Sequence, residues 1–278
     1  KTLTANTGLL GLTFVYVPAG NVRIIATKEN RQGYEDITVT ESTAVQVYLS
    51  YQGYIGDIRW HLSSDGRLTL TGNGDSILPA FPEGDAPWDD LPITISDIYI
   101  NDCIVADNAF AGKENIDTVH LQSNAVLGAN VFKGCPELYN VYLHENTVVG
   151  ESAFEGCEKL AYISFPQGSC ALGKRAFANC TALDDIHISC PDLSVGESAF
   201  EGCTTLAAVY TKYMDTWMSI RFANETANPL YYAGKLYVKG NLLTTLSTGD
   251  PIGDYTFVGC TSLTEIEFDE KLTSIGKA

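Results

Sequence analysis

A short pattern of apolar residues recurs along the second two thirds of the chain. Each copy reads apolar-x-x-apolar-x-apolar, as in Leu138-x-x-Val141-x-Leu143. The copies are Ile116-Val119-Leu121, Leu138-Val141-Leu143, Leu160-Ile163-Phe165, Leu183-Ile186-Ile188, Leu206-Val209-Thr211 and Leu263-Ile266-Phe268. The alternation at the end of each copy is the period of a β-strand with one buried face. Every copy therefore predicts one short strand, with the leading residue turned inward from a bend.

Three further residue types recur at fixed places between these copies. Phenylalanine stands at Phe110, Phe132, Phe154, Phe177, Phe200 and Phe257, with steps of 22, 22, 23, 23 and 57 residues. Cysteine follows three residues after all but the first, at Cys135, Cys157, Cys180, Cys203 and Cys260. Glycine stands four residues before the same five, at Gly128, Gly150, Gly173, Gly196 and Gly253. We expect this glycine to adopt a turn conformation that other residues cannot take.

A repeat of this length predicts a solenoid. One unit cannot bury its own apolar edge, whereas stacked units share one continuous core. We expect residues 96–278 to form a leucine-rich repeat solenoid of short parallel strands joined by turns and short helical segments, with the Phe ladder stacked inside it. The step of 57 residues predicts an irregular long repeat at 211–250, with a helical segment and a hairpin around Gly240-Asn241.

The repeat units resemble a known family. "VVGESAFEGCEKLAYISFP" and "LGKRAFANCTALDDIHIS" are similar to the BspA-like leucine-rich repeats of bacterial surface proteins. The resemblance covers roughly residues 96–278 and implies an exported cell-surface protein that mediates interactions, often adhesion. It brings no binding residues with it.

The first third of the chain lacks the repeat. Residues 1–51 hold β-rich runs separated by Gly, Pro and Asn, which predict a small β-sandwich similar to carboxypeptidase-regulatory-like or PEGA-like modules. Residues 52–95 predict a β-hairpin around Asp65-Gly66 that caps the solenoid, with Trp60 and Trp88 shielding its first open face.

The charge balance narrows the class of partner. Lys plus Arg total 17 and Asp plus Glu total 34, so the net charge is −17, which excludes a phosphate-neutralising nucleic-acid binder. The longest apolar stretch, Leu9 to Val17, is about half of a membrane span, so we expect no direct membrane insertion. We expect any export signal to lie outside this sequence.

Neither the cysteines nor the acidic residues predict catalysis, a metal site or a cofactor. No C-x-x-C pair occurs, and ladder positions on neighbouring strands, about 4.8 Å apart, are too far apart for disulfides. We interpret the ladder cysteines as small buried apolar residues. Cys103, Cys170 and Cys190 lie off the ladder; their pairing is open, and free thiols are favoured. The pairs Asp89-Asp90 and Asp184-Asp185 lack the convergence that a glycosidase needs.

One row of residues has two interpretations. The position between the last two core residues of each strand faces outward on the predicted concave sheet, and it holds Tyr99, His120, Tyr142, Ser164, His187 and Tyr210. Five of these six side chains carry a ring. The rings could stabilise the sheet by cross-strand packing, or they could form a binding surface.

The sequence favours one function and leaves two alternatives open. The leading hypothesis is a non-enzymatic exported protein that binds a protein partner, on a host or a neighbouring cell for example. The alternatives are a glycan-binding module that uses the same rings, and a structural spacer that displays another domain. The acidic neighbours Asp185, Glu265, Glu267 and Asp269 favour a basic partner.

Overall fold

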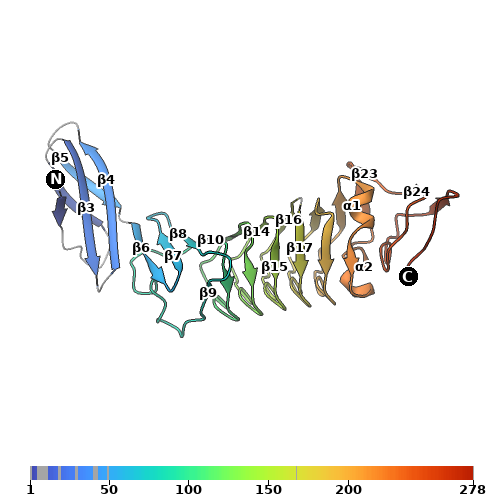
Figure 1. Cartoon of the computed structure of the whole chain (residues 1–278), viewed down its shortest axis with the longest axis horizontal. Helices are drawn as coiled ribbons and strands as arrows, with labels where there is room; N and C mark the ends of the chain where they lie inside the picture. Colours follow the sequence, from blue (N-terminus) through green and yellow to red (C-terminus); the bar gives the residue numbers. More distant parts are fainter. Residues whose placement is uncertain are drawn as a thin grey trace.

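The strands that the structure describes assemble into two long sheets and two short ones (Figure 1). The computed structural model describes the backbone of residues 2–4, 12–17, 20–28, 31–39 and 43–48, and backbone and side chains of residues 50–166 and 168–277. The first sheet has fourteen strands, in the order β1 (Thr2–Thr4), β3 (Gly20–Lys28), β4 (Arg31–Val39), β6 (Ser50–Ile55), β7 (Ile58–Leu62), β8 (Arg67–Thr71), β10 (Asp97–Asn101), β12 (Thr118–Leu121), β14 (Asn140–Leu143), β16 (Tyr162–Phe165), β18 (Asp185–Ile188), β20 (Ala208–Thr211), β22 (Leu236–Val238) and β23 (Asn241–Leu242).

A second sheet of seven strands runs through the same turns of the solenoid. Its order is β21 (Arg221–Phe222), β19 (Asp192–Val195), β17 (Ser169–Leu172), β15 (Thr147–Val149), β13 (Val126–Leu127), β11 (Ile104–Val105) and β9 (Ile77–Leu78). Strands β8 to β22 of the first sheet and all strands of the second pair in parallel with their neighbours. The predicted leucine-rich repeat solenoid is thereby confirmed.

The shorter elements lie outside these two sheets. Strands β2 (Leu12–Val17) and β5 (Thr43–Tyr48) pair antiparallel, and β24 (Thr245–Thr248) and β25 (Glu265–Phe268) pair in parallel. The described helices are α1 (Met214–Met218), α2 (Leu230–Ala233) and a 3-10 turn, Glu225–Ala227, all within the predicted irregular repeat. The side chains of residues 1–49 lie outside the described residues, so the sandwich of residues 1–51 stays a prediction.

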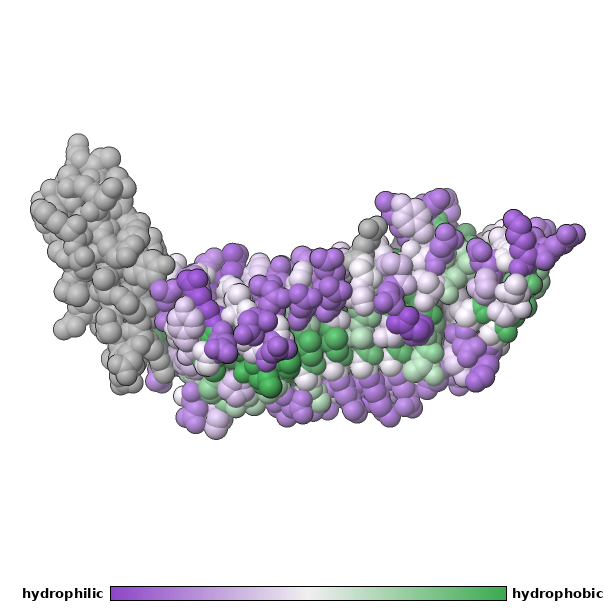
Figure 2. All heavy atoms as spheres, viewed as in Figure 1, coloured by the Kyte–Doolittle hydropathy of each residue, from purple (hydrophilic) through white to green (hydrophobic). Residues whose placement is uncertain are grey.

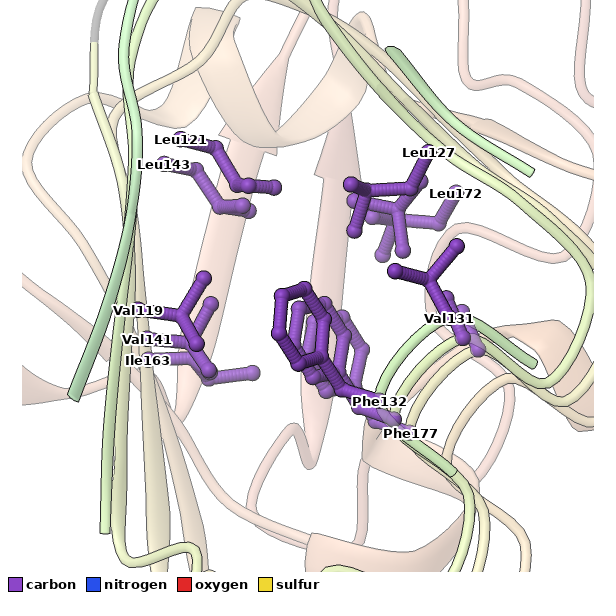
Figure 3. Packing of buried hydrophobic residues seen from close by; sticks show 14 of the residues in the cluster. Val119, Leu121, Leu127, Val131, Phe132, Val141, Leu143, Ile163, Leu172 and Phe177 are labelled. Carbon is purple, nitrogen blue, oxygen red and sulfur yellow. The ribbon is translucent and has the colours of Figure 1, made fainter. Parts of the chain in front are cut away.

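The core fills the space between the two sheets (Figure 3). Val119 and Leu121 face it from the first sheet, and Leu127 faces it from the second. Between them the phenylalanine rings stack in a column, each ring in contact with the ring one turn away. Ring centroids are 5.1–5.9 Å apart from Phe110 to Phe200, and the ring planes lie within 6° of parallel.

Tryptophan and the irregular repeat close the two ends of this column. Trp88 stacks on Phe110 with centroids 6.2 Å apart, and Trp60 meets Trp88 edge-on at 6.0 Å. At the other end, the buried Trp217 of α1 donates its indole N–H to the Thr256 carbonyl at 3.1 Å. The helical insert is therefore fastened to the turn that carries Phe257, whose side chain is only half-buried.

The recurring glycine has a different role from the predicted one. Gly128, Gly150, Gly173 and Gly196 are absent from the residues with positive φ, so no left-handed turn requires them. Instead, a Cβ built on Gly150 would lie 2.2 Å from the Gly128 carbonyl oxygen of the preceding turn. At these four positions glycine recurs because successive turns approach too closely for any side chain. Gly253 also lacks a positive φ, but a Cβ built on it would meet its nearest atom, the Thr256 hydroxyl oxygen, only at 3.3 Å.

The hairpin of the irregular repeat is shifted by one residue from the prediction. Val238 pairs with Asn241, so Lys239 and Gly240 occupy the turn, rather than Gly240 and Asn241. Both turn residues have positive φ, 52° and 79°, as a two-residue hairpin of this kind requires. Asn241 instead opens the returning strand.

Candidate binding surface

The first sheet brings the predicted row of residues into one line. Strand pairing sets Tyr99 beside His120, His120 beside Tyr142, and so on through Ser164, His187 and Tyr210. On each strand the residues before and after the row position are mainly buried Val, Leu, Ile or Phe. The row therefore points away from the core on one face of the sheet.

The rings of the row form two stacks, separated by Ser164. In the first stack, centroids are 4.0 Å apart for Tyr99 and His120 and 4.7 Å apart for His120 and Tyr142. In the second, His187 and Tyr210 are 4.7 Å apart. All these ring planes lie within 16° of parallel. Both cross-strand packing and an exposed line of ring edges are thus present in the same residues.

The second stack contains a member that the sequence analysis missed. Tyr237 of β22 pairs with Tyr210, and their ring centroids are 4.8 Å apart. Its signal was the alternation Leu236-Tyr237-Val238, which matches the other strands. The step of 57 residues hid it, because this strand follows the helical insert rather than a Phe and Cys pair.

Only part of the predicted acidic surroundings of the row lies beside it in the structure. The Asp185 carboxylate lies 3.5 Å from Nε2 of His187. Burial raises the pKa of Tyr210, and Asp185, Tyr237 and Asp184 add to the effect. Glu265 and Glu267, in contrast, lie on β25, which pairs with β24 outside the first sheet. Among the predicted acidic neighbours, only Asp185 lies on a strand of the row.

The histidine inside the first stack is a neutral ring at neutral pH. Burial lowers the pKa of His120, although Asp97 opposes this shift. A neutral imidazole between two tyrosines can stack without the cost of burying a charge. The first stack is therefore an aromatic column with no charge of its own.

The ladder cysteines form part of the packed interior of the solenoid. Four of the five ladder thiols donate to the carbonyl of the phenylalanine one turn earlier: Cys135 to Phe110, Cys157 to Phe132, Cys180 to Phe154 and Cys203 to Phe177, at 3.2–3.3 Å. The fifth, Cys260, is partly exposed, and its sulfur lies 3.5 Å from the Ser262 hydroxyl oxygen. Burial raises the pKa of Cys135 to about 11 and those of Cys157 and Cys203 to about 12. These thiols are protonated and inert at neutral pH.

All eight cysteines, on and off the ladder, are free thiols in the structure. Cys170 and Cys190 are buried; the Cys170 thiol donates to the His144 carbonyl at 3.7 Å and the Cys190 thiol to the Gly168 carbonyl at 3.1 Å. The neighbouring Cys190 thiol, together with Thr147, lowers the pKa of Cys170, whereas the Cys170 thiol and burial raise the pKa of Cys190. Burial raises the pKa of the Cys103 thiol to about 11.

A cavity of about 370 Å³ lies beside the first ring of the phenylalanine column, lined by Trp88, Phe110 and Lys113 among others. Lys113, which replaces the ladder cysteine, reaches Asp89 at 3.7 Å across it. In residues 50–166 and 168–277, no group of three or more His, Cys, Asp or Glu side chains could hold a metal ion.

The second sheet carries an outward row of its own. Its members are in register along the sheet: Ile77, Ile104, Val126, Val148, Ala171, Ser194 and Arg221. Ile77 is 61% exposed and Val148 is 39% exposed. Figure 2 shows apolar atoms in a band along the solenoid, between rows of polar atoms. This row lacks rings, so the two sheets offer chemically different faces.

Stacked parallel strands, the Leu and Phe core and the outward ring row define a leucine-rich repeat solenoid protein. The sequence profile of the BspA type leucine rich repeat region matches residues 94–226 and 240–278, in six copies. The chain belongs to this family. No curated protein matches it. In the part of the chain that the structure describes, no helix is both long and apolar enough to cross a bilayer.

Solved bacterial structures of similar fold include other leucine-rich repeat proteins. A leucine-rich repeat protein of T. pallidum is 22% identical; the match covers 81% of this chain and 86% of that one, with a TM-score of 0.35. A leucine-rich cell surface protein of Faecalibacterium prausnitzii is 16% identical, covering 81% and 72%, with a TM-score of 0.34. A leucine-rich repeat protein of Bacteroides ovatus is 14% identical, covering 81% and 90%, with a TM-score of 0.25.

Proposed function

We propose that this chain is a non-enzymatic, exported cell-surface protein that binds a protein partner through the ring row of its first sheet. The observation that carries the proposal is the row itself: six rings in two stacks, on one face of a parallel sheet. Solenoids commonly use such extended faces for binding. Tyrosine is enriched at binding hot spots because it offers a large rigid contact area and a hydroxyl.

The net charge of the protein supports a basic partner. With a net charge of −17, the chain attracts cationic surfaces and repels acidic ones. Such complementarity mainly accelerates encounter and suppresses wrong partners. Adhesion to a host or neighbouring cell would be one consequence of binding a protein at the surface.

The geometry of the stacks favours a protein over a glycan. A sugar ring packs against the face of an aromatic ring. Within each stack the facing sides of neighbouring rings are covered at 4.0–4.8 Å, so apart from the end faces next to Ser164 the row offers ring edges. Edges present Tyr hydroxyls and polarised C–H groups, which suit the hydrogen bonds of a protein surface.

A paired capture experiment tests the proposal. The whole chain, a Tyr142→Ala/Tyr210→Ala variant and a Val126→Ala/Val148→Ala control on the second sheet serve as baits for surface proteins. We expect a partner that wild type and control retain and that the ring variant loses by at least about tenfold, as for loss of a hot spot. If the ring variant retained every partner as well as wild type does, the proposal would be refuted. A glycan array with the same variants tests the sugar alternative.

A further inference from the structure

The ring row has a vacancy at its centre. Ser164 of β16 pairs with Tyr142 on one side and with His187 on the other, so it occupies the place of a ring. The rings before it and after it stack without interruption. Tyr142 and His187 each therefore have one face that no ring of the row covers.

The width of this vacancy matches one flat group. Two strand steps separate Tyr142 from His187, which is about 9.6 Å. A planar group midway would lie about 4.8 Å from each ring. The stacked pairs on either side have centroid distances of 4.7 Å, so such a group would continue the column at its own spacing.

One wall of the vacancy, His187, is accessible from solvent. The His187 side chain is 48% exposed, whereas the other rings of the row are half-buried. Tyr162, two residues before Ser164 on the same face, leans toward Tyr142 with its ring tilted by 53° at 5.8 Å. Among the described ring contacts, Tyr162 has none with His187, whose only ring neighbour is Tyr210 on the other side.

Charge and an internal example identify the group that fits. Asp185, on the same face of β18 as His187, places its carboxylate 3.5 Å from that ring. At the start of the first stack, the guanidinium carbon of Arg67 lies 5.0 Å over the Tyr99 ring. The column thus already accepts a guanidinium on one ring face. A guanidinium is planar, stacks on aromatic faces and pairs with carboxylates in a fork geometry, which an ammonium cannot do.

We propose that the Ser164 vacancy is a socket for one arginine side chain of the partner, with its guanidinium stacked between Tyr142 and His187 and paired with Asp185. This inference deepens the proposed function and rests on it. It assigns the partner a chemistry: a basic protein surface with at least one protruding arginine.

Two labelled peptides of equal charge test the socket, hexa-arginine and hexa-lysine, by fluorescence anisotropy on the whole chain at physiological salt. We expect wild type to bind hexa-arginine about tenfold more tightly, because only the guanidinium can stack and fork. Ser164→Tyr, which fills the vacancy, should reduce this preference to less than about twofold. The matched control Ser194→Tyr adds the same ring to the second sheet and should keep the full preference.

The outcomes separate the socket from the proposed function. Equal affinities of wild type for both peptides, or an unchanged preference in folded Ser164→Tyr, would overturn the socket. If Ser164→Tyr does not fold, His187→Ala, at an exposed position, is measured instead and should lose the preference. Tighter binding of a neutral tyrosine peptide would also overturn it, in favour of an aromatic occupant. A partner that depends on Tyr210 but not on the vacancy would leave the proposed function standing without the socket.

Discussion

Truncating one ring in the middle of the phenylalanine column tests whether the turns share one core. Phe154 is fully buried, and its centroid lies 5.4 Å from Phe132 and 5.1 Å from Phe177. Phe154→Ala removes the ring and leaves a cavity, which costs about 3–5 kcal/mol in typical cores.

The structure favours the upper part of that range. Backbone hydrogen bonds hold neighbouring turns at a fixed spacing, with the Phe132 N–H on the Ala153 carbonyl at 2.7 Å and the Phe154 N–H on the Ala176 carbonyl at 2.8 Å. The turns therefore cannot collapse into the cavity. We expect a loss of about 4–5 kcal/mol in the free energy of unfolding.

Phe257→Ala is the matched control. Phe257 has the same place in its repeat but is only half-buried. Its truncation should cost about 1–2 kcal/mol, because less apolar area leaves water. Urea unfolding followed by circular dichroism measures both variants, with the slope m checked against wild type.

Two results would refute the reasoning. A cost below about 1 kcal/mol for Phe154→Ala would mean that this ring is not core. If both variants lost the same free energy of unfolding, burial of the ring inside the column would not matter, which is incompatible with a shared interior.

Three other predictions follow from the same structure. Thiol titration of the denatured, unreduced protein should find all eight cysteines free; a count near zero would contradict the ladder geometry. Gly150→Ala should destabilise the protein by about 2 kcal/mol or more, because its Cβ would lie 2.2 Å from the Gly128 carbonyl oxygen; a neutral effect on the melting temperature would refute this clash. Burial opposes ionisation of Glu155, but hydrogen bonds from Arg175, Lys133 and Ser152 lower its pKa to about 2 from an ordinary 4.5. Because the folded pKa is depressed, this stabilisation is present above pH 4.5 and is lost as the pH falls through 2. Glu155→Gln should therefore cost about 1–2 kcal/mol at pH 7 and nothing near pH 2. A cost independent of pH in urea unfolding would exclude this origin.

The sequence predicted the first sheet and its core because their signals are periodic. The step between phenylalanines and the alternation in strands such as β14 identify the same register that the structure has. The row from Tyr99 to Tyr210 followed from that register alone. Predicting that a strand residue between two buried ones faces outward needs no tertiary information.

The second sheet could not be predicted in the same way. Strands such as β13 contain two residues, so they hold one outward side chain and no alternation. The role of the recurring glycine was also out of reach, because the distance between Gly150 and the preceding turn depends on how turns stack. Tyr237 was missed because β22 follows an insert that breaks the repeat period.

The chemistry of the vacancy is likewise a property of the stacked turns. In the sequence Ser164 is an ordinary strand residue. Only its pairing with Tyr142 and His187 shows that it interrupts the row of rings. Arg67 precedes Tyr99 by more than thirty residues, so its place over that ring depends on the pairing of β8 with β10.

Hydrogen exchange of the whole chain with and without a captured partner tests the central claim most directly. If the ring face of the first sheet binds the partner, peptides that contain β14, β16 and β18 gain protection, and those that contain only β15 or β17 do not. Protection confined to the second sheet, or to neither sheet, would contradict the account.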